Sequence, residues 1–124
     1  TIPMNIYLTD KAKKFIANKI QELKDDKING SFALGIYNKL IRSWSAYYIT
    51  VEVSLNTKSR FNEEFLEESV VDGLPIMITE KAKKLLNRDN IVIDEGGWIL
   101  YKHLIIQNAP IVRASRSSKG ICSL

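Results

Sequence analysis

The sequence predicts a single α+β domain in which mostly antiparallel β-strands pack against two short helices. Three observations support this fold class. Apolar and polar residues alternate in several stretches, which is the period of a half-buried strand. Two stretches of nearly identical sequence, TDKAKKFI at 9–16 and TEKAKKLL at 79–86, instead show helical spacing. A chain of 124 residues, 45% of them hydrophobic, can bury one core but not two.

The first half of the chain is predicted to form three strands and one helix. Residues 5–8 are a short apolar strand, and Thr9 caps a helix that ends in the polar turn before Gly30. The apolar face of this helix repeats at spacings of three and four: Ala12, Phe15, Ile16, Ile20 and Leu23. Residues 31–37 and 43–55 are the next two strands. One face of the longer strand carries every second residue: Tyr47, Ile49, Val51, Val53 and Leu55.

A polar connection and a hairpin follow. Residues 56–68 are acidic and are interpreted as a connecting segment without regular structure. Three apolar residues could anchor this segment: Phe61, Phe65 and Leu66. The Asp-Gly pair at 72–73 predicts a tight turn between strands at 69–71 and 74–78. Pro75 indicates that the second of these strands starts at an edge or a bulge.

The last predicted elements are a helix and a pair of strands. Thr79 caps the helix, which turns three apolar residues inward: Ala82, Leu85 and Leu86. Residues 90–93 and 98–107 are strands, joined by a turn at 94–97 that contains two glycines. The two related octets could mark an internal duplication. We favour convergence, because a threonine, an acid, lysines and an alanine suit any helix start, and the flanking sequences differ.

The charge distribution argues against a polyanion as the main partner. The formal net charge is +4, but three basic residues lie in an acid-free end: Arg113, Arg116 and Lys119. The remainder carries nearly equal numbers of basic and acidic groups, and nucleic-acid binding needs several clustered cations. An apolar run of roughly 20 residues, as needed to cross a bilayer, is absent from the sequence. We therefore expect a cytoplasmic protein without a membrane partner, for which nucleic acid is a disfavoured partner.

The chain offers little material for catalysis or metal binding. Cys122 is the single cysteine, which excludes an internal disulfide and a four-cysteine metal site. His103, the single histidine, is expected to be structural. Four glutamates could gather on one helical face, but a solvated loop is the favoured interpretation: Glu63, Glu64, Glu67 and Glu68. We expect no catalytic residue, no metal ligand and no cofactor, so the protein is not predicted to be an enzyme.

One segment has the composition of a binding surface. Between residues 37 and 48, aromatic and cationic side chains are interleaved: Tyr37, Lys39, Arg42, Trp44 and Tyr48. Such residues could stack on nucleotide bases or anchor a protein interface. Alternation places Trp44 and Tyr48 on one strand face and Tyr47 on the other, so a continuous stacking platform is not expected. Contact with a protein partner is the favoured interpretation, and nucleic-acid binding remains the alternative.

Several stretches resemble the HesB/IscA family of A-type iron–sulfur carriers. The matching stretches are IYLTDKAKKFIANKI, FALGIY, VVDGLPIMITEKAKKLL, NIVIDEG and LIIQNAP. The resemblance covers about residues 5–110. It implies a single HesB-like domain at 4–112, sandwich-like or barrel-like in its strand arrangement, and homodimer formation. Residues 1–3 and 113–124 are expected to be flexible ends or sequence foreign to the domain.

The resemblance also identifies what this chain lacks. In the family, iron or cluster binding uses a cysteine shortly after the Leu-Gly strand and a Cys-Gly-Cys near the C-terminus. Here Leu34-Gly35 is followed by no cysteine before Arg42, and the end of the chain offers only Gly120-Ile121-Cys122. Iron–sulfur clusters need several thiolate ligands. The resemblance therefore predicts a non-enzymatic interaction protein, related to iron–sulfur assembly, that has lost cluster binding.

Overall fold

The computed structural model describes residues 4–87, 90–117 and 120–122, the strand ends 115–117 and 120–122 by their backbone. Within this part, the helices are α1 (Asp10–Asp25) and α2 (Glu80–Leu86), and a 3₁₀ turn spans Lys58–Arg60. The strands are β1 (Asn5–Leu8), β2 (Phe32–Arg42), β3 (Tyr47–Thr57), β4 (Phe65–Val71), β5 (Leu74–Thr79), β6 (Asn90–Trp98), β7 (Tyr101–Ile106), β8 (Ile111–Ser117) and β9 (Gly120–Cys122). The α+β class is thus confirmed.

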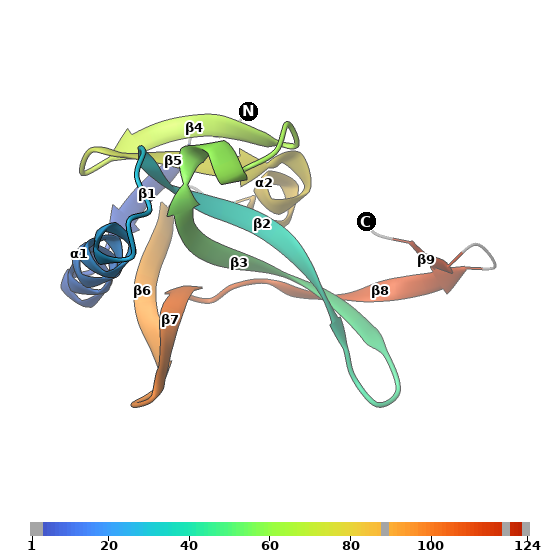
Figure 1. Ribbon diagram of the computed structural model, residues 1–124. Coiled ribbons are helices and arrows are strands. Elements are labelled where there is room, and N and C mark those ends of the chain that lie inside the picture. The colour runs from blue at the N-terminus through green and yellow to red at the C-terminus, as the bar shows by residue number, and fades with distance from the viewer. Residues whose placement is uncertain (1–3, 88–89, 118–119, 123–124) are drawn as a thin grey trace.

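The strands form two mixed sheets, and neither is closed into a barrel (Figure 1). The smaller sheet has the order β1-β6-β7, with β1 parallel to β6 and β7 antiparallel to it. The larger sheet has the order β4-β5-β2-β3-β8-β9, in which the β2–β5 pair is parallel and the other pairs are antiparallel. Its centre supplies much of the core, and the fully buried large side chains come from both sheets: Leu34, Ile36, Ile76, Ile91 and Ile93.

Both helices begin as predicted, at a threonine. Thr9 Oγ1 accepts a hydrogen bond from the Ala12 amide at 3.1 Å and donates one to Asp94 on β6 at 2.6 Å. Ala12 and Ile16 are buried on the inner face of α1. Hydrogen bonds from Thr9, from Gln107 and from the Glu95 amide hold the pKa of the Asp94 carboxyl below its ordinary value. The start of α1 is therefore tied to the smaller sheet.

The second helix repeats this arrangement at the larger sheet. Thr79 Oγ1 accepts from the Ala82 amide at 3.2 Å and donates to Asn38 Oδ1 of β2 at 3.0 Å. Ala82 and Leu86 are buried, as the helical spacing predicts. In each octet, the threonine therefore caps a helix and also bonds to a neighbouring strand, β6 for Thr9 and β2 for Thr79. The same local requirement at two helix starts is compatible with convergence of the two octets.

The boundary between the two long strands was predicted wrongly. Strand β2 continues to Arg42, and residues 43–46 form the turn that was assigned to the following strand. The Ser43 amide and hydroxyl both donate to the Ala46 carbonyl, each at 2.9 Å, which closes the turn. Apolar residues on both sides of this turn gave it the composition of a strand.

The acidic connection is also shorter than expected, because β4 begins at Phe65. Two glutamates of this strand make ion pairs, Glu67 with Lys58 at 2.8 Å and Glu68 with Lys83 at 2.9 Å. The charges that suggested a loop are therefore accommodated on a strand. The Asp-Gly turn between β4 and β5 is confirmed.

Pro75 lies in β5, which is an interior strand of the sheet rather than an edge. The parallel pairing of β5 with β2 begins one residue later, at Ile76, so the missing amide of Pro75 falls outside that pairing. The bulge in this hairpin lies in β4, between Glu67 and Ser69. The predicted irregularity exists, but on the partner strand.

The turn predicted at 94–97 also differs from the structure. Strand β6 runs through Trp98, and the chain reverses at Ile99 and Leu100. A Cβ at Gly97 would collide with the Tyr101 carbonyl oxygen, and Gly97 has a φ of 100°. The glycines therefore permit close strand approach within the hairpin instead of forming its turn.

Two strands were not predicted at all. Strand β8 pairs with β3 from Thr50↔Ile111 to Tyr47↔Ala114, and β9 returns along β8. Residues 1–3 and Lys119 lie outside the described residues, as do the side chains of Arg116 and Cys122.

Candidate partner-binding surface

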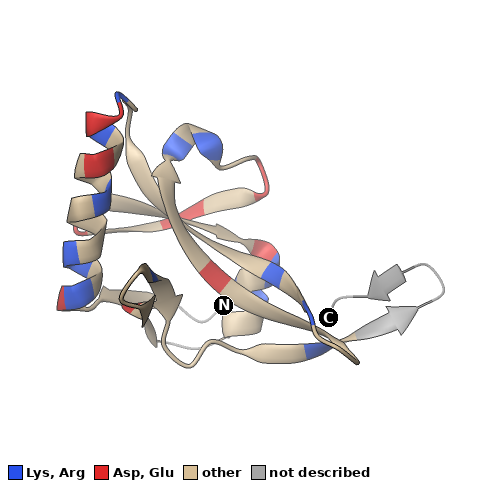
Figure 2. Cartoon of the chain, turned by 60° about the horizontal axis from the view of Figure 1, so that its bottom comes forward, with Lys and Arg blue, Asp and Glu red and all other residues tan. Residues whose placement is uncertain are grey.

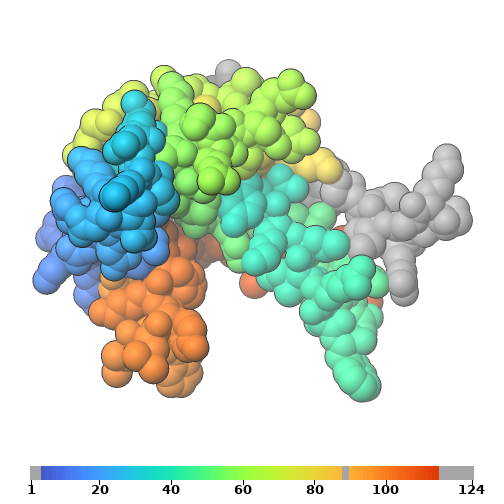
Figure 3. All heavy atoms as spheres, in the orientation of Figure 1, coloured from blue at the N-terminus to red at the C-terminus, as the bar shows by residue number. Residues whose placement is uncertain are grey.

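The segment singled out by its composition forms a projecting hairpin, here called the β2–β3 arm and comprising residues 38–50. Figures 1 and 3 show this arm extending away from the body of the molecule. Strand β8 pairs with the β3 side of the arm at residues 47–50. Its strands are held in register from Asn38↔Val51 to Arg42↔Tyr47. Because the arm is a paired ribbon and not a loop, the side chains along it have fixed directions.

The structure brings three of the five predicted binding residues to one face. Tyr37 and Lys39 are two residues apart on β2 and therefore point to the same face. Tyr48 is paired with Ile41, the next β2 residue on that face, so Tyr48 shares it. Arg42 lies on the opposite face beside Tyr47. Trp44 is in the turn, so strand alternation does not place it beside Tyr48, and that part of the prediction is wrong.

A charged network occupies the shared face. The Tyr37 hydroxyl donates to Glu52 Oε2 at 3.2 Å, and Lys39 Nζ lies 3.3 Å from the same oxygen. Burial raises the pKa of the Tyr37 phenol, and the negative charge of Glu52 raises it further. Lys39 is thus paired with Glu52, and its side chain remains 53% exposed.

Sequence reasoning missed an aromatic cluster at the base of the arm. The Phe65 ring packs edge-on to Tyr37 with centroids 6.3 Å apart, and Phe61 lies 5.1 Å from Phe65. Phe61 covers Gly35, where any Cβ would collide with its ring. The two phenylalanines predicted as anchors do pack at the sheet, and Phe65 contacts the Tyr37 ring. The third predicted anchor, Leu66, is 66% exposed, so that part of the prediction is wrong.

The outer part of the arm is apolar and exposed. Trp44 is completely exposed at 102% relative accessibility, and Leu40 and Ile41 are 42% and 38% exposed. The Arg42 guanidinium lies 5.7 Å from the centre of the Tyr47 ring, a cation–π contact. Exposed tryptophan and arginine beside aliphatic side chains are typical of the centre of a protein interface.

The other sequence candidates do not come together. His103 is exposed on β7, its Nδ1 3.3 Å from the Tyr101 carbonyl oxygen. Glu67 and Glu68 form separate ion pairs, and Glu63 and Glu64 lie in an exposed turn. Among the described residues, there is no group of three His, Cys, Asp or Glu side chains that could hold a metal ion.

A second exposed surface lies at the β6–β7 turn and was not predicted. Four consecutive large side chains, here called the β6–β7 tip, are 77–89% exposed: Trp98, Ile99, Leu100 and Tyr101. The sequence signal for this surface was the run of four large apolar or aromatic residues, WILY, directly after two glycines. It was missed because these residues were assigned to the start of a strand, where alternate side chains would be buried.

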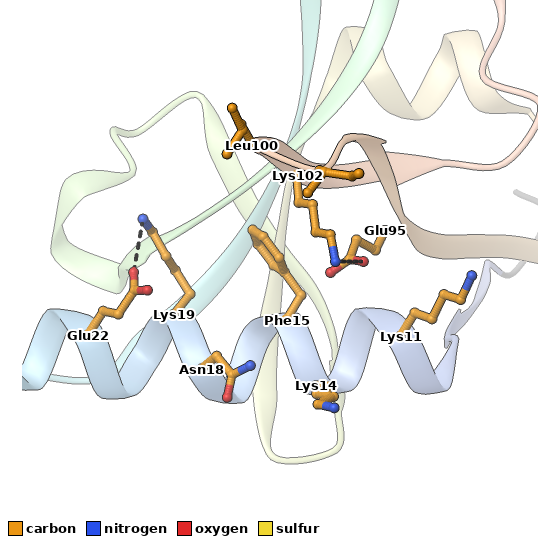
Figure 4. A pocket seen from close by; sticks show the side chains of 10 residues that line it. Lys11, Lys14, Phe15, Asn18, Lys19, Glu22, Glu95, Leu100 and Lys102 are labelled. Atoms are coloured by element: carbon orange, nitrogen blue, oxygen red, sulfur yellow. Dashed lines mark ion pairs between the residues drawn. The ribbon is translucent and has the colours of Figure 1, made fainter.

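A groove of about 600 Å³ separates this tip from α1 (Figure 4). The α1 side contributes Lys11, Lys14, Phe15, Asn18, Lys19 and Glu22, and the hairpin contributes Glu95, Ile99, Leu100 and Lys102. Two ion pairs hold part of this charge, Lys19–Glu22 at 3.5 Å and Lys102–Glu95 at 3.7 Å. The groove is therefore rimmed by lysines in excess of acids.

Comparison with known proteins does not assign the chain. It matches none of the protein-family models and none of the curated proteins with which it was compared. In the described part of the chain, neither helix has the length and apolar character needed to span a bilayer. The features of the molecule that bear on its function are therefore the fold and the two exposed surfaces.

Proposed function

We propose that this chain is a non-enzymatic HesB/IscA-like interaction protein that binds a protein partner through the β2–β3 arm. One observation carries the proposal: the arm presents a fully exposed Trp44 beyond the hydrophobic core. Leu40 and Ile41, on opposite faces of β2, add exposed apolar area to the same arm. Tryptophan at such a position adds most to binding when a partner covers it, because its large surface is then removed from water.

The surroundings of the arm favour protein over nucleic acid. Lys39 is engaged by Glu52, and Arg42 is stacked against Tyr47 on the opposite face. Strong binding to a polyanion needs several cations directed at one phosphate track. A protein partner with an apolar pocket and an acidic rim suits Trp44 and Arg42 better.

The family resemblance suggests a class of partner, the proteins of iron–sulfur assembly. The order strand, helix, paired strands, hairpin, helix, hairpin up to β7 is compatible with the resemblance, which does not account for β8 and β9. The arm follows Leu34-Gly35 directly, where the resemblance would place a thiolate, and carries exposed Leu40 and Ile41 instead. We propose that the scaffold serves iron–sulfur assembly in the cytoplasm as a homodimer that contacts an assembly protein without holding a cluster.

The decisive experiment is photo-crosslinking in cells of the source organism. A photoreactive amino acid at position 44 should give one dominant adduct with a protein of iron–sulfur assembly, and Arg42→Glu in the same chain should reduce it. The matched control places the probe at position 66, where Leu66 is 66% exposed on β4, and should not give that adduct. Equal adducts at both positions, or adducts to this chain alone, would contradict the proposal.

Three further measurements address cluster binding, the oligomeric state and the nucleic-acid alternative. Anaerobically purified protein with stoichiometric iron would contradict the loss of cluster binding. Light scattering should give the mass of a dimer. For the nucleic-acid alternative, anisotropy with a labelled single-stranded oligonucleotide should reveal no affinity that Lys39→Ala and Arg42→Ala together weaken.

A further inference from the structure

We propose that the β6–β7 tip docks the protein onto an anionic lipid surface. This inference concerns a different surface from the β2–β3 arm and does not depend on the proposed function. It departs from the expectation of no membrane partner, which followed from the absence of a spanning segment. A tip that inserts only into the surface of a bilayer does not need a membrane-spanning segment.

The shape and order of the tip favour a bilayer. Ile99 and Leu100 form the apex of a hairpin turn, and both are more than four-fifths exposed. Trp98 and Tyr101 flank them in register as the last pair of the ladder. Aliphatic residues at the apex and aromatic residues one step behind match the depth preferences of a membrane interface, where tryptophan and tyrosine lie at the headgroup level.

The charge beside the tip is of the sign that anionic lipids attract. Lys11, Lys14, Lys19 and Lys102 line the groove next to Ile99 and Leu100, against the two acids Glu22 and Glu95. Figure 2, in which the underside of Figure 1 comes forward, shows several basic segments along α1, with acidic segments toward the ends of the helix. Lysines near an anionic surface add electrostatic attraction to the burial of apolar side chains.

The direction of the tip is compatible with docking on a flat surface. Figure 3 shows the tip projecting from the body of the molecule, on the same side as the β2–β3 arm. An extended bilayer can receive a projecting tip without a matching pocket. The exposed apolar area then becomes buried on binding, which stabilises the docked state.

The test uses the protein's two tryptophans, Trp44 and Trp98, as separate reporters. Trp44→Phe leaves Trp98 as the single emitter, and Trp98→Phe is the matched variant that reports on the arm. The probes are vesicles of phosphatidylcholine with an equal part of phosphatidylglycerol, and vesicles of phosphatidylcholine alone. With the anionic vesicles, Trp98 emission should shift to the blue and the protein should co-sediment. Both signals should weaken as salt is added.

Substitutions at the tip and on α1 then separate the two contributions. Ile99→Asp should lower the partition coefficient at least about tenfold, since it removes a buried aliphatic side chain and adds a charge. Lys14→Gln should lower it about fivefold, whereas Lys24→Gln, in the last turn of α1, should leave it unchanged. Leu66→Asp, an exposed apolar site on β4, is the control for Ile99→Asp. Circular dichroism should confirm that all variants fold.

Three results would overturn the inference. The first is the absence of co-sedimentation and of a Trp98 shift with anionic vesicles. The second is an equal partition coefficient for Ile99→Asp and the unchanged protein. The third is self-association of the free protein that Ile99→Asp abolishes while vesicles remain unbound, which would assign the tip to a contact between copies.

Discussion

Two threonines each join a helix start to a polar side chain on a neighbouring strand. Thr79 is 6% exposed and binds both the Ala82 amide and Asn38 of β2. Thr79→Val keeps the shape of the side chain but removes both hydrogen bonds of the hydroxyl, so the Asn38 oxygen loses this donor. We expect the free energy of unfolding to fall by about 2 kcal/mol, combining the loss of an N-cap with that of a partly buried hydrogen bond.

Urea unfolding measures this effect, and Thr79→Ser is the matched control. Serine keeps the hydroxyl, so Thr79→Ser should retain most of the stability that Thr79→Val loses. If the two variants were equally destabilised, packing of the threonine methyl group would be the cause instead of its hydrogen bonds.

Tyr37 should make stability depend on pH in alkaline solution. Burial and the adjacent Glu52 raise its pKa above the ordinary value of 10.0. The folded state therefore binds the phenol proton more tightly than the unfolded state. The stability that results is complete below pH 10 and is lost as pH rises through the raised pKa.

Tyr37→Phe removes this titration while keeping the ring that packs on Phe65. Between neutral pH and alkaline pH, the urea midpoint of the unchanged protein should fall more than that of Tyr37→Phe. Parallel pH profiles would show that neither burial nor Glu52 raises the pKa of Tyr37 in the folded state.

At the scale of elements, the two hairpins show which turns a sequence reveals. The Asp72-Gly73 turn was predictable because aspartate and glycine both tolerate the positive φ that a two-residue turn of this kind requires. In the structure their φ angles are 50° and 79°. The turn at Ile99 and Leu100 was missed because nothing in these residues favours a turn. The preceding Gly96-Gly97 pair carried the stronger turn signal, although its glycines are needed for close strand approach.

This difference gives a prediction about the two hairpins. Gly97→Ala should destabilise the protein by about 2–4 kcal/mol, because its Cβ would meet backbone at Tyr101 in addition to the cost of a positive φ. Gly73→Ala has open space around it and should cost only about 1 kcal/mol from its φ. Thermal unfolding of both variants tests this order. Equal losses would mean that the strands around Gly97 separate without penalty.

At the scale of the whole molecule, the sequence predicted the fold class but not the pairing of distant segments. Strand β1 pairs with β6 more than eighty residues away, and β5 pairs in parallel with β2. Local periodicity indicates which residues are buried, but not which strand lies beside them. For the same reason, the sequence identified 37–48 as a segment with the composition of a binding surface. It did not show that these residues divide between two strand faces and a turn, because that division follows from the pairing of β2 with Tyr47 and Tyr48 of β3.

The organisation of the large sheet leads to a last prediction. Among the described side chains, the main hydrophobic cluster includes none from β8, which pairs with β3 only at residues 47–50. Deleting residues 111–124 should therefore leave the body folded and its urea midpoint little changed. The β2–β3 arm would become an isolated two-stranded ribbon, and such ribbons are marginally stable in water.

Hydrogen exchange followed by NMR distinguishes the arm from the body. Amides in the arm should exchange much faster after the deletion, while those of Ile91 and Ile93 in the smaller sheet keep their protection. The Thr50 hydroxyl, which donates to the Pro110 carbonyl at 2.8 Å, retains its partner and marks where the effect should end. Loss of protection throughout the chain would instead show that β8 is part of the cooperative core, and the arm could then not be treated as a separate binding element.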